Sequence, residues 1–107
     1  MRRVVVTGIG LLTSIGEGAD ESWKNLINCK SGIKKITSFD TENFPCKIAG
    51  GLLNTEFNIE KYIDLKDIKR NDRFIQYGLI AAKMAIQDAN IQNLNDEEKI
   101  KVGVSVG

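Results

Sequence analysis

Near its N-terminus the chain reads Arg3-Val-Val-Val-Thr7, followed at once by Gly8-Ile-Gly10. A short β-branched run without polar alternation is typical of a strand buried on both faces of a sheet. The two glycines permit tight backbone geometry where such a strand leaves the sheet. This stretch predicts the first strand of an α/β domain and the loop that follows it.

Three later segments complete the expected architecture. Asp20 is placed to cap a helix that runs to about Asn28, and residues 47–52 are expected to form a short strand or hairpin arm. The last segment is Lys101-Val-Gly-Val-Ser-Val-Gly107, which reads as a strand. This order predicts a β–α–β unit with a parallel sheet and a right-handed crossover. Because neither a turn nor a helix follows that strand, we expect the front piece of a larger domain.

The longest helix is expected to start after Asn71 or Asp72 and to end at about Asn90. Most of its circumference is apolar, which is typical of a helix buried on several sides. Gly78 and nearby alanines add a small-residue surface suited to close packing. A narrow polar stripe remains, consisting of Asp72, Gln76, Lys83 and Gln87.

Composition narrows the class of function. Fifteen basic and fourteen acidic residues give a net charge of +1, so no global field favours nucleic acid or an anionic membrane. No apolar run is long enough for a membrane span or a signal-peptide core, and we expect a cytoplasmic location. Cys29 and Cys46 lack CxxC spacing and have no histidine nearby, so we interpret them as reduced thiols and expect no metal site. Without any histidine, no Ser/His/Asp or Cys/His arrangement is possible.

The glycine loop also suggests a dinucleotide-binding site, which we weigh as the weakest alternative. Gly8 and Gly10 begin a GxGxxG pattern, but its third glycine would fall at Thr13. The acidic residue expected about twenty positions later is replaced by Lys30-Ser31. Tight backbone geometry is the simpler explanation for the two glycines.

Basic residues gather ahead of the long helix, at Lys61, Lys66, Lys69, Arg70 and Arg73. Helical spacing places Lys66, Lys69 and Arg70 on one exposed face, with Asn58 or Asp64 as possible caps of the short turns there. Such a face is either simply solvated or a docking patch for an acidic partner. Asp64 and Asp67 interleave and would partly neutralise it.

Several short motifs occur in a fixed order along the whole chain. They are Arg2-Arg-Val-Val-Val-Thr-Gly-Ile-Gly-Leu-Leu-Thr-Ser-Ile-Gly16, Trp23-x-x-Leu26, Lys30-Ser-Gly-Ile33, Ser38-Phe-Asp-Thr41, Ile48-Ala-Gly50, Arg73-Phe-Ile-Gln-Tyr-Gly78, Ala81-Ala82, Ala85, Asp88-Ala89 and Val102-Gly-Val. Together they resemble the opening of the β-ketoacyl-[acyl-carrier-protein] synthases, and the type II elongating enzymes more than type I. The resemblance implies that residues 1–107 are the N-terminal segment of a thiolase-like domain, an incomplete mixed sheet layered between helices.

The resemblance also implies a function in fatty-acid biosynthesis, the decarboxylative Claisen condensation of an acyl thioester with malonyl carrier protein. The family's cysteine and two histidines lie beyond Gly107, and neither Cys29 nor Cys46 occupies that motif, so we expect no catalytic residue here and no activity from this chain alone. No bound cofactor is implied, because phosphopantetheine arrives on the carrier protein.

Acyl carrier protein is the implied partner. Lys66, Lys69 and Arg70 match the part of the family that touches it. Full-length members are expected to form homodimers. Two alternatives stay open, a non-catalytic fragment that binds carrier protein and a degraded reading frame without a stable fold.

Overall fold

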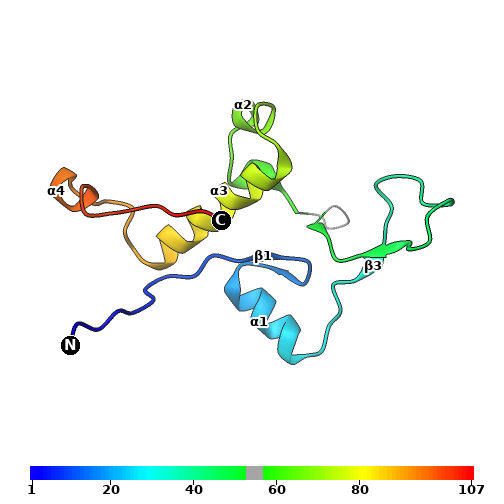
Figure 1. Ribbon diagram of the computed structural model, residues 1–107, viewed down its shortest axis with the longest axis horizontal. Helices are drawn as coiled ribbons and strands as arrows, with labels where there is room; N and C mark the ends of the chain where they lie inside the picture. Colours follow the sequence, from blue (N-terminus) through cyan, green and yellow to red (C-terminus); the bar gives the residue numbers. More distant parts are fainter. Residues whose placement is uncertain (53–56) are drawn as a thin grey trace.

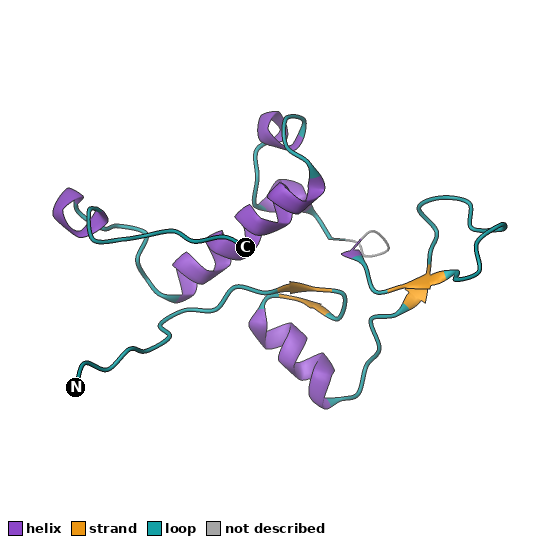
Figure 2. Cartoon of the chain, in the orientation of Figure 1, coloured by secondary structure: helices purple, strands orange, loops and turns teal. Residues whose placement is uncertain are grey.

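The computed structural model describes residues 1–52 and 57–107. In chain order the elements are β1 (Leu12–Thr13), β2 (Gly16–Glu17), α1 (Ala19–Ile27), β3 (Lys34–Lys35), β4 (Ile48–Ala49), the 3-10 helix η2 (Ile59–Lys61), α2 (Leu65–Ile68), α3 (Arg73–Asp88) and α4 (Asp96–Lys99). Figure 1 shows them in an open arrangement, with α1 below the β1–β2 hairpin, α3 above it, and α2 on an upper protrusion. Long stretches of loop connect these parts (Figure 2).

Two small antiparallel hairpins supply the strand pairing. Leu12 pairs with Glu17 in the first hairpin, and Lys34 pairs with Ala49 in the second. The strand expected within residues 47–52 is therefore confirmed at β4. The parallel β–α–β pairing is wrong for this structure, since every pairing among the described residues is antiparallel.

The expected strands at residues 3–7 and 101–107 are also wrong for this structure. Both segments run as chain outside any sheet (Figure 2), and their valines lie exposed. Val4 is 96% exposed and Val104 is 88% exposed. A β-branched run becomes a buried strand only where neighbouring strands complete its hydrogen bonds and other layers cover its faces. Within the described residues, no strand pairs with these two segments and no layer covers their faces.

Helix α1 closely follows its predicted range, but its cap differs. Gly18 occupies the N-cap position with φ 87°, a conformation that glycine adopts without strain, while Asp20 lies inside the first turn. A carboxylate there interacts favourably with the helix dipole. The helix packs on the first hairpin through hydroxyl groups, since Thr13 Oγ1 and Ser22 Oγ lie 3.0 Å apart and each donates to the Gly16 carbonyl at 3.2 Å.

Helix α3 ends two residues before its predicted end. Asn90 adopts φ 56°, and a residue in this left-handed conformation commonly terminates a helix. Ile80 is fully buried and, with Ile63, forms the buried apolar core of the described residues. Phe74 is 74% exposed, so the expectation of burial on several sides holds only for part of this helix.

The glycines of the opening loop lie directly against α3. A Cβ atom added to Gly8 would come within 2.4 Å of the Ala85 carbonyl oxygen, and one added to Gly10 within 1.9 Å of the Ala81 carbonyl oxygen. Close backbone approach to α3 therefore requires glycine at both positions. The expected reason, tight geometry where a strand leaves a sheet, is wrong for this structure, because residues 3–7 form no strand. The surface approached is the small-residue face of a helix rather than the edge of a sheet.

Candidate functional site

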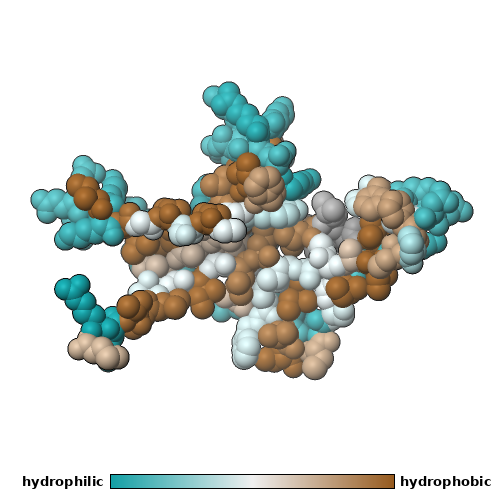
Figure 3. Space-filling view, viewed as in Figure 1, coloured by the Kyte–Doolittle hydropathy of each residue, from teal (hydrophilic) through white to brown (hydrophobic). Residues whose placement is uncertain are grey.

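The three predicted cations Lys66, Lys69 and Arg70 lie together on the protruding turn formed by α2 and the residues after it. All three are exposed, and none forms an ion pair within the described residues. Figure 3 shows this protrusion as strongly hydrophilic at the top of the view. The structure therefore presents a small, exposed cationic surface without ion pairs among the described residues, which we call the α2 patch.

Asp64 and Asp67 contribute less to neutralising the patch than their interleaving suggests. Asp64 occupies the N-cap position of α2, where its side chain makes no capping bond and its carbonyl accepts from the Ile68 amide at 3.0 Å. Asp67 is exposed and forms no ion pair within the described residues. Both carboxylates are free to turn into solvent, so the three cations stay accessible to an acidic surface.

Lys61 does not belong to the α2 patch, although it lies in the same basic stretch of sequence. Its Nζ is 3.0 Å from Glu17 Oε1 on β2, and it lies 5.1 Å from the centroid of the Tyr62 ring. Asn58 caps η2 as predicted, accepting from the Glu60 amide at 3.0 Å. Lys61 therefore joins the segment before α2 to the first hairpin.

Tyr62 completes this connection. Its hydroxyl group donates to the Glu17 carboxylate, and its ring stacks on Phe57 with a centroid distance of 5.9 Å. The hydrogen bond from Tyr62 lowers the pKa of Glu17, with Lys61 acting in the same direction against partial burial. Burial raises the pKa of Tyr62, and the Glu17 contact adds to the increase. Glu17 is therefore a stably ionised anchor, unsuited to act as a general acid.

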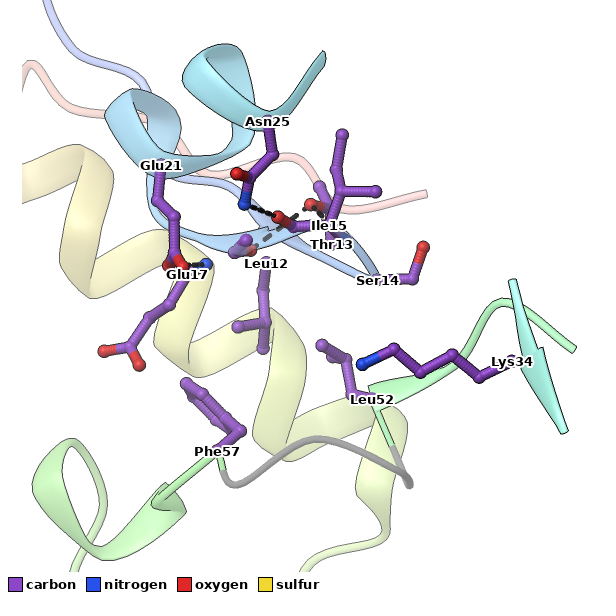
Figure 4. Close-up of a pocket in the computed structure, with 11 residues that line it drawn as sticks. Leu12, Thr13, Ser14, Ile15, Glu17, Glu21, Asn25, Lys34, Leu52 and Phe57 are labelled. Atoms are coloured by element: carbon purple, nitrogen blue, oxygen red, sulfur yellow. Dashed lines mark hydrogen bonds between the residues drawn. The ribbon is translucent and has the colours of Figure 1, made fainter. Parts of the chain in front are cut away.

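A hollow of about 300 Å³ lies beside this connection, lined by the first hairpin, α1, Lys34, Leu52 and Phe57. Figure 4 shows Lys34 reaching toward it from β3 and Phe57 from the segment before η2. The hydroxyl of Thr13 is engaged with Ser22 and Gly16, and the Asn25 amide donates to the Ile15 carbonyl at 2.5 Å. These polar groups hold the hairpin to α1 and do not form a nucleophile with an adjacent base.

The remaining candidate chemistry is limited. Cys29 and Cys46 are free, exposed thiols, and Cys46 Sγ contacts the Ile48 carbonyl at 3.3 Å. Across residues 1–52 and 57–107, no three cysteine or carboxylate side chains converge as metal ligands would. The helices described there are all too short or too polar to cross a bilayer.

Sequence reasoning identified the cations but missed the residues that connect to their segment. Local sequence patterns indicate no role for Glu17 or Tyr62, because their contact spans 45 positions in sequence. Gln76 was assigned to a polar stripe, yet it is buried. The one usable signal was that a glutamine on an otherwise apolar helix needs a hydrogen-bond partner when it is covered.

Comparison with known proteins agrees with this architecture. The β-ketoacyl synthase N-terminal domain matches residues 1–107. A solved structure titled the ishigamide ketosynthase/chain length factor superposes with a TM-score of 0.72 at 36% identity, over 91% of this chain and 23% of that one. The fold is thus the N-terminal part of a thiolase-like α/β domain.

Curated relatives point to the same group. Two proteins named 3-oxoacyl-[acyl-carrier-protein] synthase 2, from Staphylococcus aureus strain N315 and from Vibrio cholerae serotype O1, are 43% and 42% identical over 106 residues. Those 106 residues are 99% of this chain and 25% of each relative, so the chain spans about a quarter of their length. The chain belongs to the β-ketoacyl synthase family.

Proposed function

We propose that this chain forms the N-terminal part of a β-ketoacyl-[acyl-carrier-protein] synthase of fatty-acid biosynthesis. This is the decarboxylative condensing enzyme that the names of its relatives describe. Within that function, we assign the α2 patch to docking of the acidic acyl carrier protein. The observation that supports this most is the exposure of Lys66, Lys69 and Arg70 without any ion pair among the described residues. Unpaired cations on a protrusion give orientation and association rate to an anionic partner.

The condensation itself is not assigned to side chains of this chain. Nucleophilic catalysis by a cysteine needs a nearby base or a cationic neighbour to generate the thiolate. The sequence contains no histidine, and Cys29 and Cys46 are free, exposed thiols. We therefore propose that these 107 residues contribute scaffold and docking, and that they do not condense acyl and malonyl carrier proteins by themselves.

Charge reversal tests the docking assignment in the protein that carries this sequence. The triple variant Lys66→Glu, Lys69→Glu, Arg70→Glu should bind acyl carrier protein roughly 10- to 100-fold more weakly, because three surface ion pairs of up to about 1 kcal/mol each are lost. Fluorescence anisotropy with labelled carrier protein, repeated across a salt series, measures the affinity. The dependence on salt should become shallower in the variant.

A matched control reverses three exposed lysines outside the patch, Lys30, Lys47 and Lys101. This control changes the total charge equally, so a local docking site predicts near-normal affinity for it. Equal weakening by both triple variants, or unchanged affinity in the patch variant, would rule out the α2 patch as the docking face. Condensation by the isolated chain that a thiol reagent blocks would contradict the scaffold assignment.

A further inference from the structure

The polar stripe of α3 is not simply a solvated edge of the helix. Gln76 is only 4% exposed, and its amide lies beneath the C-terminal end of α2. Lys83, two turns later on the same stripe, reaches the segment that precedes α2. Both side chains donate to backbone carbonyl groups of the chain that carries the α2 patch.

Gln76 makes two such contacts from one amide group. Its Nε2 donates to the carbonyl of Ile68 at 2.9 Å and to the carbonyl of Asn71 at 2.7 Å. Ile68 is the last residue of α2, where carbonyl groups lack partners within the helix. The other amide atom, Oε1, is buried without a hydrogen-bond partner among the described residues. The Gln76 side chain thus donates to two carbonyls while its own Oε1, a buried acceptor, has no partner among the described residues.

Lys83 acts at the other side of the patch. Its Nζ donates to the carbonyl of Tyr62 at 2.5 Å, while the Tyr62 hydroxyl is held by Glu17. The backbone is thus fixed at residue 62, three residues before α2, again at residue 68, the last residue of α2, and at residue 71 after it. The cations Lys66, Lys69 and Arg70 lie between these two points.

Helix α2 cannot fix its own orientation. It has only four residues, and none of them is buried. A single helical turn is unstable in water, because its nucleation costs more conformational entropy than its hydrogen bond returns. The direction in which the three cations project must therefore come from contacts outside α2.

We propose that Gln76 and Lys83 are positioning residues for carrier docking, holding the backbone of residues 62–71 on α3 so that the α2 patch faces its partner in one orientation. This inference rests on the proposed function, in which the patch binds acyl carrier protein. Neither residue needs to touch the partner. Each reduces the entropic cost of docking, because the patch is already ordered before the partner binds.

The test uses Gln76→Met in the protein that carries this sequence. Methionine has nearly the same length and no charge, so it removes both donations and leaves every cation in place. Amide hydrogen exchange should become roughly tenfold faster in peptides covering residues 65–71. Affinity for acyl carrier protein should fall roughly 3- to 10-fold, with an unchanged dependence on salt because the number of cations is unchanged.

Gln87→Met is the matched control. Gln87 lies on the same stripe of α3, and its exposed side chain makes no hydrogen bond within the described residues. Both measurements should match the wild-type protein. Lys83→Met provides an independent second variant, which should accelerate exchange in residues 62–64 and also weaken carrier binding; its value does not depend on whether Gln76→Met folds well.

The outcomes separate the inference from the proposed function. Faster exchange with unchanged carrier affinity overturns the positioning role, as does unchanged exchange in both variants or an equal effect of Gln87→Met. Absence of carrier binding by the wild-type protein overturns the proposed function instead, while the exchange measurement still decides whether α3 anchors the segment.

Discussion

Glu17 shows how much one residue can connect in this molecule. Its carboxylate accepts from Lys61 Nζ at 3.0 Å and from the Tyr62 hydroxyl, and its backbone amide donates to Glu21 Oε2 at 2.8 Å. The residue therefore joins the first hairpin, α1 and the segment before α2. Because the Tyr62 hydrogen bond and Lys61 lower the pKa of Glu17, the connection has a defined dependence on pH.

We predict that acid weakens this connection. A carboxyl group whose pKa is lowered on folding contributes stability that is fully present above its unfolded pKa, about 4.3 for glutamate, and is lost as the pH falls through the lower folded value. Exchange of the Tyr62 and Ile63 amides, measured from about pH 6 to pH 3 and corrected for intrinsic rates, should therefore show growing loss of protection below about pH 4. The effect is modest, since the Glu17 side chain is 31% exposed.

Glu17→Gln is the control for that titration. The amide can still accept from Tyr62, but it does not titrate, so protection at residues 62 and 63 should be lower throughout and independent of Glu17 ionisation. A variant with the wild-type acid profile would show that another carboxylate causes the loss.

At this scale the sequence allowed some residues to be predicted and others not. Helical spacing correctly placed Lys66, Lys69 and Arg70 on an exposed turn, because that pattern is local. It could not show that Lys61 is engaged elsewhere, since its partner Glu17 lies 44 positions away. The burial of Gln76 likewise depends on how α2 folds back over α3.

Among the elements, α3 organises most of the described chain. One face receives the opening glycine loop, with the Ile9 amide also donating to Asp88 Oδ2 at 2.8 Å. Its polar stripe holds the segment that carries the α2 patch. The first surface of α3 packs by close backbone contact with the glycine loop. The second holds its neighbouring segment by hydrogen bonds from long polar side chains.

Substitution of glycines on the two sides of this contact should have opposite effects. Gly10→Ala places a methyl group against the Ala81 backbone and should lower the free energy of unfolding by about 2 kcal/mol or more. Gly78→Ala lies inside α3, where no atom of the described residues beyond the local helix backbone comes within 4 Å of the added Cβ. This variant should leave stability unchanged or raise it by up to about 1 kcal/mol. Urea unfolding of the protein that carries this sequence measures both changes. Equal destabilisation by the two variants would contradict the close approach as the reason for glycine at position 10.

The elements that sequence predicts well are those whose determinants are local. Helices α1 and α3 lie within two residues of their expected bounds, and strand β4 falls inside the expected range 47–52, because amphipathic spacing and turn residues specify them. The valine runs at residues 3–7 and 101–107 were expected to pair, and the structure leaves them unpaired. A strand exists only with its neighbours, so its formation depends on distant parts of a sheet.

The whole molecule is open rather than closely packed. Its radius of gyration is 17.1 Å, against about 13 Å for a compact domain of similar length. Ile63 and Ile80 are the buried apolar residues among those described, while large apolar side chains lie exposed along both termini and α1 (Figure 3). Such an arrangement buries too little apolar surface to offset the conformational entropy of folding.

We therefore predict that the 107 residues by themselves lack a sharp thermal transition. They should bind the dye ANS strongly at 25 °C, as loosely packed chains with exposed apolar surface do. Circular dichroism during heating and ANS fluorescence provide the measurements. A cooperative melt with little dye binding would contradict the prediction and indicate that the exposed valine segments find partners within the chain.

One exposed side chain gives this chain a built-in optical reporter. Trp23 is its single tryptophan and lies 64% exposed on α1, beside Leu26 and Ile27. Indole emission responds to the polarity of its surroundings, so the fluorescence spectrum reads the hydration of this one helix face without any introduced label. Any surface that covers α1, in assembly or in folding, should therefore shift the emission maximum of Trp23 to shorter wavelength. No other residue of the chain can produce this shift, because Trp23 is its single tryptophan.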